Sequence, residues 1–183
     1  MNFSRTDKIQ ILENAISWIV VLAMIIYGGS KPFQFSDPAM IKKAVSELNG
    51  MELMWAFYGY SKGFAMTIGF FEIVGAILIL IRKTRIIGCL VTSTVLVNII
   101  LQDIFYGVHL GALTAAIIYQ TIILIILWLH RTKIVHGLKA LFIQNEAKRN
   151  KNHLLLKFTL TFLLFVVLRI IEYYLTIGIT PGN

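Results

Sequence analysis

A few polar side chains interrupt the long apolar stretches of this 183-residue chain, and they are its candidates for chemistry. They are Glu72, Asn98, Gln102, Asp103, Arg169 and Glu172. The three between 98 and 103 follow i, i+4 and i+5 spacing, which places them on roughly one face of a helix. Arg169 and Glu172 are three residues apart and share a face of another helix. Carboxylates, amides and one guanidinium at such spacing predict a polar, ligand-binding surface.

The depth of these groups decides how they can meet. A charged group in the core of a bilayer costs at least ~2.5–3.5 kcal/mol, so each one needs a structural or functional reason. At a rise of about 1.5 Å per residue, Glu72 lies roughly 15 Å from the basic turn at Arg82, near the bilayer midplane. Asp103 and Arg169 lie further out, at similar heights. Arg169 can therefore pair with Asp103 or with Glu172, whereas Glu72 has no obvious cation at its own level.

Two interpretations of this polar set stay open. The first is a ligand-binding pocket among the second, third and fifth membrane spans, open to the outside, with Glu72 at its floor. The second is a set of interhelical hydrogen bonds that only hold the helices together.

The elements that position these residues are apolar helices. The chain is 57% hydrophobic and 14% charged, with a mean hydropathy of +0.77, whereas soluble domains carry about 25% charged residues. Five stretches reach the roughly 20 residues that a bilayer crossing requires. We expect membrane-spanning helices at about 10–28, 62–81, 86–105, 109–129 and 154–177, within one transmembrane domain over 1–183.

Basic residues predict the orientation. Twelve Lys and Arg flank one side of the five spans, counting Arg85 in the turn after the second span, and four flank the other side. Since basic loops stay cytoplasmic, we expect a plasma-membrane protein with its N-terminus inside and its C-terminus outside. The net charge of +8 comes from these flanks, so the lipid bilayer is the expected partner and nucleic acid is not.

Two connectors are long enough to fold. In the first, Asp37-Pro38 resembles a helix start and Gly50 a helix end, so we expect a short interfacial helix over 38–49. The apolar segment 51–60 either lengthens the second span or dips into the interface. In the connector between the fourth and fifth spans, an apolar stripe with basic neighbours, starting at Ile134, predicts a second interfacial helix.

Patterns for metal, haem or hydrolytic chemistry are missing from the sequence. The four histidines fall at the ends of the predicted spans, so none offers a pair of haem ligands within the membrane. Cys89 is alone, which argues against a dithiol redox site. We therefore assign no catalytic residue, no metal ligand and no evident cofactor, with a quinone as the cofactor that the predicted pocket could hold.

Part of the chain resembles a known family. Residues 69–108, GFFEIVGAILILIRKTRIIGCLVTSTVLVNIILQDIFYGV, combine a glycine–glutamate–glycine helix, an R-x-T-R turn and a second helix with an asparagine in its outer half. With YGGSKPFQF at 27–35 and WAFYGYS at 55–61, this order of features resembles the DoxX-like family of small membrane proteins over about residues 15–135.

The resemblance implies a four-helix transmembrane bundle, and Glu72, Arg85 and Asn98 form its most specific part. Residues 153–178 depart from the family pattern as an added fifth helix, which brings Arg169. Family members include a subunit of a thiosulfate:quinone oxidoreductase, proteins that act with oxidative-stress proteins, and receptor chaperones. The resemblance therefore implies a fold more than an activity.

Three functions follow from these observations. The first is a non-catalytic subunit that binds a protein partner, or a second copy of itself, and assists assembly. The second is a membrane subunit of a quinone-linked oxidoreductase, with the quinone head group near Glu72. The third is binding or transport of a small lipophilic molecule in the predicted pocket.

Overall fold

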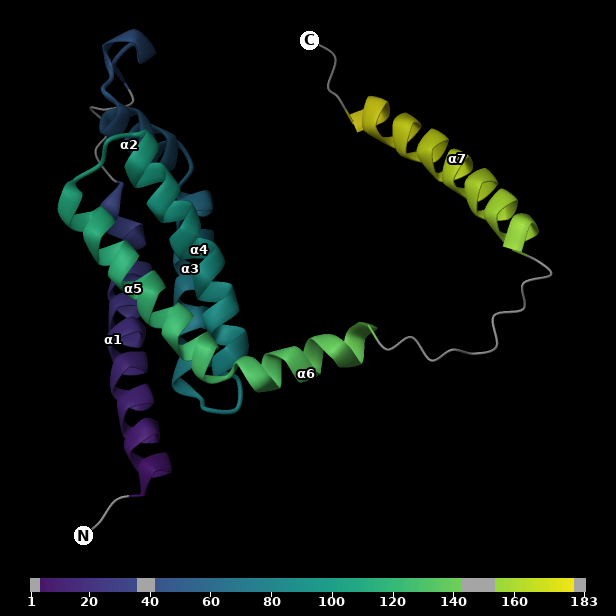
Figure 1. Ribbon diagram of the computed structural model, residues 1–183. Coiled ribbons are helices and arrows are strands. Elements are labelled where there is room, and N and C mark those ends of the chain that lie inside the picture. The colour runs from purple at the N-terminus through teal and green to yellow at the C-terminus, as the bar shows by residue number, and fades with distance from the viewer. Residues whose placement is uncertain (1–3, 36–41, 143–153, 180–183) are drawn as a thin grey trace. The chain divides into compact units, whose positions relative to one another are not determined.

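The computed structural model describes residues 4–35, 42–142 and 154–179, and every element in these ranges is helical (Figure 1). The elements are α1 (Arg5–Gln34), η2 (Val45–Glu47, a 3₁₀ turn), α2 (Gly50–Tyr60), α3 (Lys62–Leu80), α4 (Arg85–Phe105), α5 (Leu110–Leu129), α6 (Arg131–Phe142) and α7 (Leu154–Ile179). Helices α1, α3, α4, α5 and α7 are long and apolar enough to cross a membrane. Each of them overlaps one of the five predicted spans, and together they indicate a multi-pass integral membrane protein.

The chain separates into two compact units, residues 1–138 and 139–183. In the first unit, α1 packs on α3, α3 on α4, α4 on α5 and α5 on α1, so four helices surround one core. That core consists of small and branched apolar side chains, among them Val20, Met24, Ala76, Ile79, Leu96, Ile123 and Ile126. The second unit contains α7.

Helix α1 is longer than predicted at both ends, and this matters for the site. It begins after a capping box at Ser4 and continues through Pro32 into its last turn. Near that end, α1 and α3 touch backbone to backbone. A Cβ atom on Gly28 would stand 2.6 Å from the carbonyl oxygen of Gly69, so only glycine allows this approach. The contact brings the last turns of α1 beside Glu72.

The helix predicted over 38–49 is wrong in its described part. Residues 36–41, including the expected start at Asp37-Pro38, lie outside the described residues, and the 42–49 segment contains no α-helix but only 3₁₀ structure, at Lys42 and in η2. Gly50 begins a helix instead of ending one. The reason is Asn49, whose side chain accepts a hydrogen bond from the Glu52 amide at 2.9 Å and caps α2.

The segment 51–60 lies in α2, a helix of its own that precedes the second span. It ends at Ser61, which also caps the next helix, because the Ser61 hydroxyl accepts a hydrogen bond from the Phe64 amide at 3.3 Å. The break at Ser61 separates this segment from α3, so it does not lengthen the second span as one continuous helix. Helix α6 confirms that the connector after the fourth span is helical.

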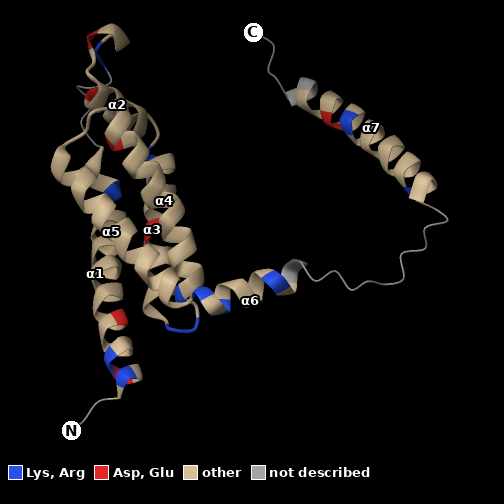
Figure 2. Cartoon of the chain, in the orientation of Figure 1, with Lys and Arg blue, Asp and Glu red and all other residues tan. Residues whose placement is uncertain are grey.

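Lys and Arg residues gather at the end of the first unit where α1 begins, α3 turns into α4 and α6 starts (Figure 2). They are Arg5, Lys8, Arg82, Lys83, Arg131 and Lys133. Arg85 was counted among the basic residues of the turn, and this was wrong. It is the first residue of α4, and its side chain is only 2% exposed. At the opposite end of the unit, a hairpin turn joins α4 to α5 through Gly107, at φ +62°.

Candidate functional site

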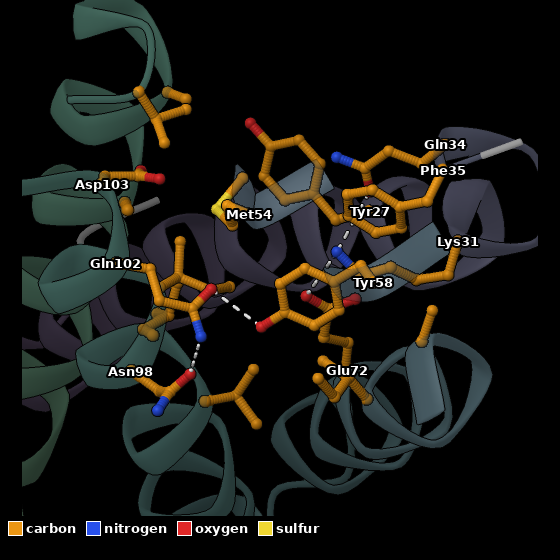
Figure 3. Close-up of a pocket in the computed structure, with 18 of the residues that line it drawn as sticks. Tyr27, Lys31, Gln34, Phe35, Met54, Tyr58, Glu72, Asn98, Gln102 and Asp103 are labelled. Carbon is orange, nitrogen blue, oxygen red and sulfur yellow. Dashed lines mark hydrogen bonds and ion pairs between the residues drawn. The ribbon is translucent and has the colours of Figure 1, made fainter. Parts of the chain in front are cut away.

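A cavity of about 570 Å³ lies within the first unit, toward the end that carries α2 (Figure 3). Its wall is formed by the last turns of α1, by α2, by the first half of α3, by the second half of α4 and by the start of α5. Aromatic and aliphatic side chains dominate the wall, and a few polar groups from α1, α2, α3 and α4 point into it. Clefts of this size and character commonly hold small organic molecules.

A chain of hydrogen bonds crosses one side of the cavity (Figure 3). The Tyr58 hydroxyl donates to Gln102 Oε1 at 2.8 Å, and Gln102 Nε2 donates to Asn98 Oδ1 at 2.6 Å. Burial raises the pKa of the Tyr58 phenol, so this hydroxyl keeps its proton and acts as a donor at neutral pH. The chain fixes the orientation of both amides and links α2 to α4.

Glu72 is fully buried and has a cation at its own level, contrary to the sequence expectation. The Lys31 ammonium lies 3.6 Å from Glu72 Oε1 and also donates to Gln34 Oε1 at 3.2 Å. The prediction failed because α1 was expected to end at about residue 28. The helix continues past that point, and the Lys31 side chain then reaches back along the wall toward Glu72. Neither Glu72 oxygen has a hydrogen-bond partner among the described residues.

Asp103 contributes a second carboxyl group from α4. Its side chain is 5% exposed and lines the cavity, and Oδ2 has no hydrogen-bond partner within the described part of the chain. No salt bridge within 4.0 Å reaches it from the described cations. In Figure 3, Asp103 and the Lys31 side chain lie on opposite sides of the cavity. A buried carboxyl group without a partner is costly for the fold unless something else satisfies it.

The structure therefore brings four predicted site residues, Glu72, Asn98, Gln102 and Asp103, to one cavity. The prediction assigned this pocket to the second, third and fifth spans. The first span, α2 and the start of α5 supply much of the described wall.

The other two predicted residues, Arg169 and Glu172, lie on α7 in the second unit. Arg169 pairs there with Glu172 at 2.5 Å, the partner on its own helix that the sequence also allowed. The Arg169 side chain is 59% exposed within the structure, whereas that of Arg85 is 2% exposed.

A second buried polar cluster surrounds Arg85, at the end of the unit opposite α2. Arg85 Nη1 donates to Glu13 Oε1 at 2.6 Å, Nη2 donates to Asn14 Oδ1 at 3.0 Å, and Nε donates to the Ile79 carbonyl at 3.0 Å. His130 Nε2 lies 3.0 Å from the same Glu13 oxygen. This cluster ties α1, α3, α4 and the end of α5 together. Its bonds do not extend to Glu72 or Asn98, the other members of the triad that the family resemblance singled out.

Sequence reasoning missed the role of three groups in these clusters. Lys31 and Glu13 were visible only as flanking or interrupting charges, because their partners lie 41 and 72 residues away along the chain. Tyr58 belongs to the segment 51–60, which the sequence analysis did single out. The aromatic residues of that segment were the signal that could have indicated a wall of the cavity.

Comparison with known proteins adds one relative and no function. No protein-family model matches the chain, and no solved structure matches it. Over 84 residues it is 36% identical to YwoB of Bacillus subtilis (strain 168), which is described as an uncharacterized protein. The match covers 46% of this chain and 53% of YwoB, so the chain spans about half the length of that relative.

Proposed function

We propose that this protein binds a small lipophilic molecule with a polar group in the cavity of its first unit. The observation that supports this is the burial of Glu72 and Asp103, both facing one cavity and both with oxygens that no described residue hydrogen-bonds. Polar groups that only hold helices together would satisfy each other across the helix interfaces, as Arg85 does with Glu13 at 2.6 Å and with Asn14 at 3.0 Å. A ligand would cover the apolar wall and meet the open oxygens.

The proposal includes the membrane setting expected from the sequence. The four-helix unit would be a DoxX-like bundle in the plasma membrane, with the N-terminus in the cytoplasm, the C-terminus outside and α7 as an addition. The gathering of basic residues at the end where α1 begins supports this orientation (Figure 2). The cavity would then open toward the outer half of the membrane. A quinone is one lipophilic molecule that such a cavity could hold. The proposed role is binding alone and includes no catalysed reaction.

The experiment fills the cavity and asks whether a bound molecule is lost. Ala112 lines the cavity, so Ala112→Trp should occupy it. Ala15 is exposed and lies outside the lining, which makes Ala15→Trp the matched control. Protein purified from its membrane in mild detergent is analysed by native mass spectrometry, with solvent extraction to identify released molecules.

We expect a small molecule on the unmodified protein and on the Ala15 variant, and its absence from the Ala112 variant. If all three forms carry the same molecules, or none carries any and no lipophilic compound raises the melting temperature, the proposal is wrong. A ligand at about 100 times its Kd should stabilise the protein by about 2.7 kcal/mol, which thermal melting detects readily.

A second candidate function is assembly with a protein partner or a second copy through α7. The supporting observation is the Arg169–Glu172 pair, whose side chains are 59% and 58% exposed near the middle of an apolar helix. Charged groups on such a helix favour a polar partner over lipid. We expect the Arg169→Leu, Glu172→Leu double variant to lose the partner or the dimer, measured as mass in detergent by light scattering. An unchanged mass and unchanged co-purified proteins would contradict this role.

A further inference from the structure

The cavity holds more negative than positive charge among its described residues. Its formally charged side chains are Lys31, Glu72 and Asp103. Lys31 lies against Glu72 at 3.6 Å, so these two groups compensate each other. Asp103 is 5% exposed and has no cation within salt-bridge distance in the described part of the chain. An isolated carboxylate in such a place gains strongly from a cation that enters the cavity.

The nearby histidine does not supply that cation. His109 lines the cavity and caps α5, and its Nδ1 accepts a hydrogen bond from the Gly111 amide at 3.1 Å. That ring nitrogen is engaged by the backbone of α5, and no salt bridge within 4.0 Å joins His109 to Asp103 in the described part of the chain. Asp103 is therefore left as the open anionic group of the cavity.

The rest of the wall suits an organic cation with an apolar body. Phe35 stacks on Tyr58 with ring centroids 4.8 Å apart and meets Trp55 edge-on at 5.3 Å. Aromatic faces attract ammonium groups, and the Lys31 ammonium already lies 5.7 Å from the centre of the Phe35 ring. The apolar surface of these rings would accept the hydrocarbon part of a ligand.

We propose that the ligand of this cavity is a lipophilic amine, bound in its protonated form with the ammonium group at Asp103 and the apolar body against the Phe35–Trp55–Tyr58 wall. This inference rests on the proposed function and specifies its ligand class. A fatty acid would bring a third carboxylate beside Glu72 and Asp103. A neutral carbonyl compound offers only acceptors, and therefore leaves the Asp103 oxygen unsatisfied.

The test uses three probes with one carbon skeleton and different terminal groups: phenylbutylamine, phenylbutanol and phenylbutyric acid. Binding to the full-length protein in a neutral detergent is followed by fluorescence of Trp55, which lines the cavity, whereas Trp18 and Trp128 are exposed. We expect the amine to bind about ten- to hundredfold more tightly than the alcohol, the range for a hydrogen bond to a charged group. The acid should bind most weakly.

The decisive variant is Asp103→Asn, which keeps the shape of the side chain and removes its charge. It should reduce affinity for the amine to the level of the alcohol and change affinity for the alcohol by less than about twofold. Glu47→Gln removes an exposed carboxylate outside the cavity and should leave all three affinities unchanged. Melting temperatures of the variants show whether each one is folded.

The outcomes separate this inference from the proposed function. If the unmodified protein binds amine and alcohol equally, or binds the acid best, the amine proposal is overturned while a lipophilic-ligand cavity stands. The unmodified protein alone decides this, so a poorly folded Asp103 variant does not obscure the answer. If a folded Asp103→Asn protein keeps its preference for the amine, the anchor is wrong. If no probe binds and the Ala112→Trp variant carries the same molecules as the unmodified protein, the proposed function fails as well.

Discussion

Replacing Arg85 with methionine should destabilise the protein more than any other single charge removal at this end of the bundle. The substitution keeps the length of the side chain and removes the guanidinium, which is 2% exposed and makes three hydrogen bonds. It leaves the Glu13 carboxylate, itself only 9% exposed, without its guanidinium partner. Removing one partner of a buried ion pair typically costs about 3–5 kcal/mol.

That free energy converts to a large shift in thermal unfolding. For chains of about 150–250 residues, each kcal/mol moves the melting temperature by about 2–4 °C, so we expect a decrease of roughly 6–20 °C. The assay is thermal melting of the purified protein in detergent. Arg82→Met is the matched control, because Arg82 is exposed in the turn just before α4 and should change the melting temperature little.

A double-mutant cycle tests the physical reason. Adding Glu13→Gln to Arg85→Met removes the uncompensated carboxylate, so the double variant should be more stable than the sum of the single losses by about 1–3 kcal/mol. If Arg85→Met melts like Arg82→Met, the guanidinium does not hold the helices together. If the two single losses simply add, the Glu13–Arg85 bond is not the source of the stability.

Two further predictions concern helix packing and the cavity wall. Gly28→Ala should lower the free energy of unfolding by about 1–3 kcal/mol, because the added Cβ would meet the α3 backbone. Gly29→Ala is the control, since its Cβ would have open space and should be neutral or slightly stabilising. Thermal melting distinguishes the two variants, and equal effects would contradict the close contact. Tyr58→Phe should cost about 0.5–1.5 kcal/mol through the lost hydrogen bond to Gln102, while Tyr60→Phe, at an 83% exposed position, should cost almost nothing in the same assay.

The sequence predicted the membrane helices well because their signal is local. A run of about 20 apolar residues requires a helix whatever surrounds it, so the spans could be placed from composition alone. The polar face of α4 followed from spacing in the same way. What failed depended on a boundary or on a distant partner. Lys31 was placed outside the first span, which hid its contact with Glu72.

Arg85 is a second residue whose distant partner could not be identified from the local sequence. Counting basic residues treats every arginine near a turn as a solvated flank, yet this side chain points inward to a glutamate 72 residues earlier. The predicted helix over 38–49 failed because Gly50 can follow a helix or begin one. The choice depended on Asn49, whose side chain caps the helix that follows.

The backbone contact between Gly28 and Gly69 lies about one helical turn from Glu72. Two rods that already touch can rock about the point of contact, but they cannot come closer there. The distance between α1 and α3 beside Glu72 is therefore fixed, and it limits how thick a bound molecule can be at that level. Adjustment to larger molecules falls to α2, a short helix that the break at Ser61 separates from α3. The glycine contact should therefore limit the width of the molecules that bind, and the position of α2 should limit their length.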